Sequence, residues 1–314
     1  MPRVLSVSNM PSISIVKSNN EQVVFDLINS DTSMANALLR TMKLDVPTMA
    51  IDFVEVEDNT SSISNESLIH RLAQIPLIST DAEQFETSSN CTCADYLCRK
   101  CAVIYELNVK CDEETRQMNV TSNDLVVITK GTTVVPRNYN PNADRNTEMH
   151  SDHPPILICK LRANEQISLT AAAIKGTGKM HSKWEPGVAL NYKPETLIYI
   201  HLNVLNSLNE TKKNRIVDEI VKSCPMNIFT KRENTIDIED SYRCTHCGSC
   251  TEKVKKIGVP GLVDVGYRET TFRVYVETNG SLTPQALVIS AFRVLKNRIR
   301  IQIGDVKNLM KNMS

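Results

Sequence analysis

The chain has 314 residues, which is more than one ordinary hydrophobic core needs, so we expect two domains rather than one. Its 36 lysines and arginines balance 36 aspartates and glutamates, and this neutrality excludes a histone-like binder that holds nucleic acid by a large positive surplus. A hydrophobic share of 41% with 23% charged residues excludes a disordered chain, and aromatic residues at 5% argue against a base-stacking platform.

The N-terminal segment predicts two strands followed by a helix. Residues 12–16 and 23–28 alternate as strands and are joined by a polar turn. Residues 31–33 offer an N-cap for a helix over 34–42, which Pro47 brings to an end. The apolar residues of this helix fall on two sides, so one side can pack on its own sheet and the other on a partner.

The middle of the chain predicts strands, one short helix and long loops. The residues from about 80 to 155 are polar and rich in loops, and a helix is expected at 66–73. Two of the expected strands, 156–161 and 167–174, look like a pair. The strands are expected at 50–57, 156–161, 167–174 and 197–204, with a basic loop at 175–186.

The C-terminal segment repeats the design of the N-terminal one. After a polar helix at 208–222, a strand is expected at 271–277, and Thr283 and Pro284 then cap and open a long helix. The two ends therefore favour one α+β domain, made of strands and two long helices, with the middle of the chain inserted between its halves. The alternative is two independent domains in sequence.

Ten cysteines are better explained as metal ligands than as disulfides. The chain lacks a run of about 18 apolar residues and a secretory signal, so we expect it in the cytosol or nucleus, where thiols stay reduced. Four of the ten lie within eleven residues, at Cys91, Cys93, Cys98 and Cys101. A four-cysteine set closes a tetrahedron around Zn²⁺ and leaves no open position, which predicts a structural zinc site and not a catalytic one.

A second group consists of three cysteines at two-residue spacings and one distant cysteine that precedes a proline. These are Cys244, Cys247, Cys250 and Cys224. The pattern is typical of one bacterial-type [4Fe–4S] cluster, and it excludes a two-cluster ferredoxin because no cysteine follows Cys250 at the required spacing. A second zinc ion, with His246 as a substitute ligand, and a set that binds nothing are the alternatives.

The sequence contains no set of residues that predicts catalysis. H-E-x-x-H and G-x-S-x-G are missing, as is a closely spaced aspartate triplet that could hold two Mg²⁺ ions. The stretch Gly176–Lys179 lacks the spacing of a phosphate-binding loop, because Met180 follows the lysine. We therefore predict a non-catalytic protein.

Several stretches of the chain resemble the α-like subunits of RNA polymerases. They are Asp31–Arg40, Val46–Asp52, His70–Leu77, Val120–Leu125 and Gly178–Trp184. The resemblance covers nearly the whole chain, and within the family it favours the branch that serves eukaryotic RNA polymerase II. The branch shared by polymerases I and III is the alternative, and the loop Cys91–Cys101 counts against it because that branch usually lacks a comparable set.

The resemblance implies a discontinuous dimerisation domain of residues 1–50 and 205–314, with a β-rich inserted domain at 51–204. The inserted domain would carry the zinc loop 91–101, and a ferredoxin-like cysteine segment would occupy 223–256. Archaeal relatives often keep such a segment, whereas familiar animal and fungal ones lack it. The resemblance also implies that chemistry belongs to the two largest polymerase subunits.

The resemblance further implies a heterodimer with a smaller α-like subunit, formed through the two long helices. This pair would assemble with the second-largest catalytic subunit and small zinc-binding subunits in the nucleus, and would meet DNA only through the complex. An iron–sulfur redox or sensor protein is the alternative from another class. The expected interface residues are Met34, Leu38, Leu39, Met42, Leu287, Ala291, Phe292, Leu295 and Ile299.

Overall fold

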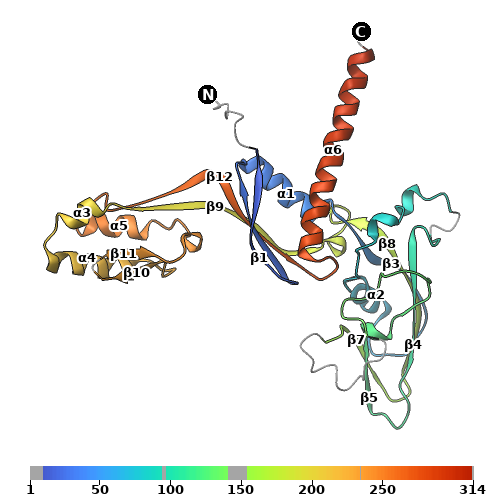
Figure 1. Cartoon of the computed structure of the whole chain (residues 1–314). Helices are drawn as coiled ribbons and strands as arrows, with labels where there is room; N and C mark the ends of the chain where they lie inside the picture. The colour runs from blue at the N-terminus through green and yellow to red at the C-terminus, as the bar shows by residue number, and fades with distance from the viewer. Residues whose placement is uncertain (1–9, 94–96, 141–153, 234, 313–314) are drawn as a thin grey trace. The chain divides into compact units, whose positions relative to one another are not determined.

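The computed structural model describes residues 10–93, 97–140, 154–233 and 235–312 of a mixed α+β protein (Figure 1). Contacts divide the chain into two compact units, and each unit is built from segments that are far apart in the sequence. Unit 1 contains residues 1–16, 24–36 and 191–275, and unit 2 contains residues 17–23, 37–190 and 276–314. These bounds differ from those of the predicted domains, which remain a prediction.

Unit 1 holds most of a four-stranded sheet and a small helical region. The strand order is β1-β2-β12-β9, which leaves β1 at one edge with all seven of its residues exposed. The strands are β1 (Ser12–Ser18), β2 (Gln22–Ile28), β9 (Gly187–Ile200) and β12 (Val263–Thr278). The helical region contains α3 (Leu202–Asn206), α4 (Glu210–Ser223), α5 (Ser249–Lys256) and the hairpin of β10 (Phe229–Arg232) with β11 (Thr235–Ile238).

The helical region of unit 1 has a core of its own. Val217 and Ile220 of α4, Val254 of α5 and Leu262 are buried together. Cys224 and Cys250 belong to the same cluster of side chains, each 8% exposed. The second group of cysteines therefore lies against a packed apolar core rather than on an isolated loop.

Unit 2 holds two sheets and the short helix α2, and it also contains the long helix α6 and most of α1. The main sheet has the order β3-β8-β4-β6, and β5 pairs only with β7. The strands are β3 (Pro47–Asn59), β8 (Gln166–Thr177), β4 (Ala102–Lys110), β6 (Val126–Val127), β5 (Gln117–Thr121) and β7 (Leu157–Arg162). The helices are α2 (Asn65–Ala73), α6 (Pro284–Asn312) and α1 (Thr32–Leu44), whose first five residues belong to unit 1.

One face of the main sheet of unit 2 forms the largest core. Ile51, Ala173 and Val103 lie side by side across β3, β8 and β4, and all three are fully buried. Leu68 and Leu72 of α2 belong to the same cluster. Because side chains alternate between the two faces of a sheet, the neighbours of these residues along each strand point to the other face.

The predicted N-terminal caps of both long helices are confirmed. The Asp31 carboxylate accepts a hydrogen bond of 2.7 Å from the backbone N–H of Met34. Thr283 Oγ1 accepts one of 3.3 Å from the N–H of Ala286, and Pro284 is the first residue of α6. Such side-chain acceptors satisfy N–H groups that have no partner within the helix.

The predicted pairing of the strands near 156–161 and 167–174 is wrong. Strand β7 pairs with β5, while β8 lies between β3 and β4. Strand β4 falls in the span that was predicted to be loop-rich. None of the described helices is long and apolar enough to cross a membrane.

Candidate metal centres and helical interface

The first four cysteines meet in one small space at the start of β4. Cys91 follows a short 3₁₀ turn, and Cys101 immediately precedes Ala102 of β4. The backbone N–H groups of Cys101 and Ala102 both donate to the carbonyl of Cys98, at 3.0 and 2.9 Å, and so close the turn between the last two thiols. The side chains of Ala50, Ile174 and Trp184 pack beneath this loop.

The distances between these sulfurs fit a single metal ion. All four Sγ atoms lie within 4.8 Å of one another. Cys91 Sγ is 3.5 Å from Cys98 Sγ, and Cys101 Sγ is 3.7 Å from both Cys93 and Cys98. Four sulfurs bound tetrahedrally to Zn²⁺ at about 2.3 Å would be about 3.8 Å apart, so this donor set matches such an ion in size and in chemistry.

The environment of the loop favours a thiolate at one position and disfavours it at another. The backbone N–H of Lys100 and the thiol of Cys91 lower the pKa of Cys98 to about 7. Burial, followed by the neighbouring Cys98 thiol, raises the pKa of Cys101 to about 12. A bound cation would supply the charge that a buried Cys101 thiolate needs.

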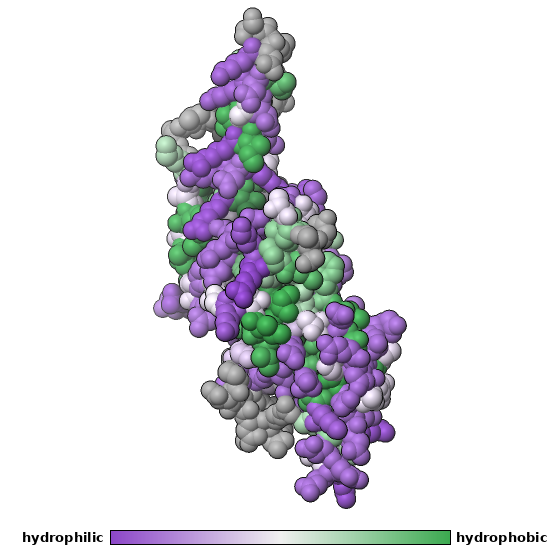
Figure 2. Space-filling view, turned by 90° about the vertical axis from the view of Figure 1, so that its right-hand side faces the viewer, coloured by the Kyte–Doolittle hydropathy of each residue, from purple (hydrophilic) through white to green (hydrophobic). Residues whose placement is uncertain are grey.

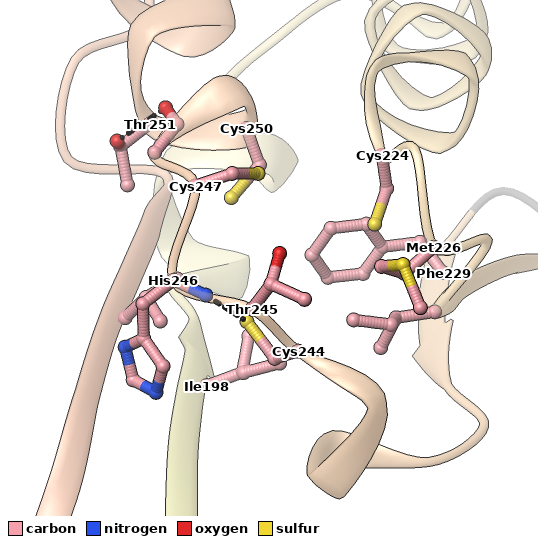
Figure 3. Close-up of a pocket in the computed structure, with 13 residues that line it drawn as sticks. Ile198, Cys224, Met226, Phe229, Cys244, Thr245, His246, Cys247, Cys250 and Thr251 are labelled. Carbon is pink, nitrogen blue, oxygen red and sulfur yellow. Dashed lines mark hydrogen bonds between the residues drawn. The ribbon is translucent and has the colours of Figure 1, made fainter.

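The second four cysteines line one cavity in unit 1. The cavity has a volume of about 120 Å³, and its apolar lining includes Ile198, Met226 and Phe229. Figure 3 shows the sulfurs of the four cysteines facing this space, with Cys224 opposite the loop that carries the other three. These residues are Cys224, Cys244, Cys247 and Cys250.

This second set differs in spacing from the first. In the part of the chain that the structure describes, Cys91, Cys93, Cys98 and Cys101 are the one group of three or more ligands within 4.8 Å. Fewer than three sulfurs of the second set therefore lie within that distance of one another in this conformation. His246 lines the same cavity, but its ring points away from the sulfurs (Figure 3), and its Nε2 lies 3.1 Å from Thr196 Oγ1.

Two thiols of the second set have shifted pKa values. The Ser249 hydroxyl lies 3.4 Å from Cys247 Sγ, and together with the N–H of Ser249 it lowers the pKa of Cys247. Burial raises the pKa of Cys250. Gly248, between them, has φ of 75° and precedes α5, a backbone conformation that side-chain-bearing residues rarely adopt.

The expected interface residues fall into three groups according to how far the chain itself buries them. Four of them are fully buried within this chain and so cannot contact a partner directly: Leu38, Met42, Leu287 and Ala291. Leu39, Phe292 and Leu295 are half-buried. Met34 and Ile299 are exposed, at 37% and 54%.

The exposed apolar side of α6 continues beyond the residues that the sequence singled out. Ile299, Ile303, Val306 and Met310 recur at i, i+4, i+7 and i+11, which places them on one side of the helix. Their exposed fractions run from 49% to 67%. Figure 2 shows green hydrophobic side chains among the purple ones along this exposed length. Sequence reasoning missed this extension because it stopped at Ile299, although the same periodicity continues.

Comparison with known proteins matches residues 54–192 to the family described as the RNA polymerase Rpb3/RpoA insert domain. This match covers less than half of the chain, and it identifies that part as an insert domain of the kind found in RNA polymerase subunits. A Dictyostelium discoideum protein, DNA-directed RNA polymerase II subunit rpb3, is 35% identical over 94% of this chain and 95% of its own length. The chain belongs to the Rpb3 family of RNA polymerase subunits.

Two further relatives place the chain within that family. Subunit 3 of the Arabidopsis thaliana RNA polymerases II, IV and V is 32% identical over 94% of this chain and 91% of its own length. A Dictyostelium discoideum subunit of polymerases I and III, rpac1, is 27% identical over 95% of this chain and 82% of its own length. The lower identity of the latter, and the smaller share of its own length that is matched, disfavour the polymerase I and III alternative.

Proposed function

We propose that the chain is the third subunit of nuclear RNA polymerase II and that its role is structural and not catalytic. The observation that carries this proposal is the similarity to a polymerase II subunit over 94% of the chain. The sequence lacks the aspartate set that would hold catalytic Mg²⁺, in agreement with this role. Nucleotidyl transfer then belongs to the assembled enzyme, and the alternative of a freestanding redox protein is not favoured.

We further propose that the chain forms a heterodimer with a smaller α-like subunit through α6 and the outer side of α1. The exposed stripe from Ile299 to Met310 supports this, because a helix that presents apolar residues to water needs a covering partner. Val288, Phe292 and Leu295 continue the same stripe toward the start of α6. This pair would go on to bind the second-largest subunit and small zinc-binding subunits.

We propose Zn²⁺ as the occupant of the first cysteine set, where it would hold the loop 91–101 against the sheet. The separations between the sulfurs support a single tetrahedral ion. The closed set of four thiolates leaves no position for substrate, so the site would be structural.

For the second cysteine set we propose a [4Fe–4S] cluster. The support for a shared occupant is the common cavity of about 120 Å³ that all four cysteines line, and the support for iron–sulfur is their spacing in the sequence. Zinc in this second set is the competing proposal. Anaerobic purification separates the two, since an iron–sulfur cluster absorbs visible light, bleaches on reduction and yields iron with inorganic sulfide, whereas zinc gives none of these signals.

The function is tested by purifying the tagged full-length chain from cells and identifying what accompanies it. We expect the two largest subunits of polymerase II and one small α-like subunit in equal amounts, together with RNA synthesis by the complex on a DNA template. The free chain should show no such synthesis. Recovery with the largest subunits of polymerases I and III, or with none, would overturn the assignment.

A further inference from the structure

The outer face of the main sheet in unit 2 carries an exposed apolar row. The register places Phe53, Ala172 and Ile104 side by side across β3, β8 and β4. Ile128 continues the row, since its N–H donates to the Ile104 carbonyl at 2.9 Å. Phe53 is 47% and Ile128 48% exposed, whereas Ala172 is only 4% exposed and Ile104 is half-buried, so the row is open to solvent at Phe53 and Ile128.

The next row along the same face is acidic. Glu55 and Glu106 flank Thr170, and Val126 stands next to Glu106 with 58% of its surface exposed. Residues two apart on a strand share a face, so Phe53 and Glu55 lie on the same face of the sheet. A bulge at Asp52 shifts the register between Ile51 and Phe53, which places Phe53 opposite Ala172 of β8. Neither glutamate forms an ion pair within the described part of the chain.

The row on the other side of the apolar one is already covered. Ala50, Ile174 and Ala102 are buried beneath the cysteine loop and Trp184. Lys183, the cation at this border, is engaged with Asp52 and with the Ile51 carbonyl. Moving away from the cysteine loop, the face therefore presents a covered row first, then the apolar row and then the acidic row.

We propose that this face, defined by Phe53, Ile104, Ile128, Glu55 and Glu106, binds a cationic amphipathic segment of another polymerase polypeptide. Apolar side chains of that segment lie on the apolar row, and a lysine or arginine reaches the two glutamates across Thr170. Neighbouring strands are about 4.8 Å apart, so one cation above Thr170 is about that far from the strand of either carboxylate.

The charge of the face selects this occupant over others. A nucleic acid would bring its phosphates onto two unpaired carboxylates, which is unfavourable. An acidic peptide would meet the same repulsion, and a purely apolar one would leave the glutamates at the rim without partners. The inference rests on the proposed role in polymerase assembly, and it adds the location and the chemistry of one contact.

The contact can be tested by placing the photoreactive amino acid p-benzoylphenylalanine at position 53 in the full chain, within a polymerase assembled from co-expressed subunits. After irradiation we expect a cross-link to one polymerase polypeptide, at a peptide in which apolar residues stand next to lysine or arginine. A cross-link to DNA or RNA, a cross-link to an acidic or uncharged peptide, or no cross-link would overturn the proposal.

A charge-reversed variant, E55K/E106K, tests the acidic row. We expect roughly tenfold less cross-linked product, and recovery when the lysine or arginine of the cross-linked peptide is changed to glutamate. The control E113K/E114K, in an exposed loop of the same unit, should leave the cross-link unchanged. Equal losses in both variants, or no loss in E55K/E106K, would contradict the proposal.

The same samples separate this inference from the proposed function. The smaller α-like subunit should remain bound in every variant, because its contact with α6 does not involve the sheet face. Loss of that subunit from the parent chain would argue against the proposed function, whereas loss of the cross-link alone argues only against this contact.

Discussion

Cys98 holds a central place in the first cysteine set, because its carbonyl closes the turn and its thiol contacts both Cys91 and Cys101. Replacing it in the variant Cys98→Ser should remove bound zinc and lower the melting temperature, since three thiolates cannot close the tetrahedron. Elemental analysis together with a thermal melt would check both effects. Zinc that remained at one ion per chain would contradict the assignment of this ligand.

Cys111 provides the matched control for that experiment. Its buried thiol donates to the carbonyls of Asp112 and Thr115, at 3.8 and 3.3 Å, and a serine hydroxyl can make the same kind of bond. Cys111→Ser should therefore keep its zinc. If both variants lost metal equally, general damage to the fold would be the cause.

A contact between Gly176 and Trp184 offers a second prediction at this scale. A Cβ atom at position 176 would lie 2.4 Å from the indole ring, whose Nε1 donates to the Ile174 carbonyl at 3.1 Å. Gly176→Ala should destabilise the chain by about 1–3 kcal/mol, because the buried ring has to shift. Gly266→Ala, where the added carbon meets nothing within 4 Å, should have little effect in the same denaturant titration.

These residues also mark what the sequence could and could not predict. The spacing of the four cysteines from Cys91 to Cys101 was sufficient to predict a shared metal site, since ligands so close in the chain cannot be far apart in space. The contact of Gly176 with Trp184 was not predictable, because it depends on how the turn after β8 folds back. The spacing of the second cysteine set indicated a shared site, while only the structure shows that Cys224 reaches the same cavity.

At the scale of elements, α6 separates structural from interface residues along one helix. The double substitution Ile299→Asp/Ile303→Asp should abolish pairing with the smaller α-like subunit, since it places two charges in the apolar stripe. Folding should persist, because both residues are about half exposed, at 54% and 49%. Co-purification measures pairing, and circular dichroism with zinc content measures folding.

Asn308 is the control position on the same helix. It is exposed and lies nine residues after Ile299, on the opposite side of the helix from the stripe. Asn308→Asp should leave pairing intact. Unchanged pairing in the double variant would remove the stripe from the interface, whereas Leu287→Asp should unfold the chain because Leu287 is fully buried.

The elements themselves were partly predictable. Capping residues and apolar periodicity were sufficient to predict the helices α1 and α6, because both signals are local in the sequence. The pairing of β7 could not be predicted in the same way. Its nearest strand in the sequence is the one at 167–174, yet β7 pairs with β5. The periodicity of α6 identified its apolar residues, but it could not tell which of them the chain covers itself.

At the scale of the whole molecule, the exposed apolar surface predicts how the chain behaves without partners. The stripe on α6 and the edge strand β1, in which Ile13, Ile15 and Val16 are 47–69% exposed, are both sites for association with other chains. Expressed alone, the chain should therefore aggregate, and co-expression with the smaller α-like subunit should make it soluble. Size-exclusion chromatography with light scattering would measure both states.

The α6 variant shows how much of this aggregation comes from the helix. Ile299→Asp/Ile303→Asp, expressed without a partner, should be more soluble than the parent chain, because charges replace part of the surface that drives association. It should also gain nothing from co-expression, because the surface that the partner covers has been altered. A parent chain that was monodisperse at micromolar concentration would contradict the argument, since neither the stripe nor the edge strand would then need a cover.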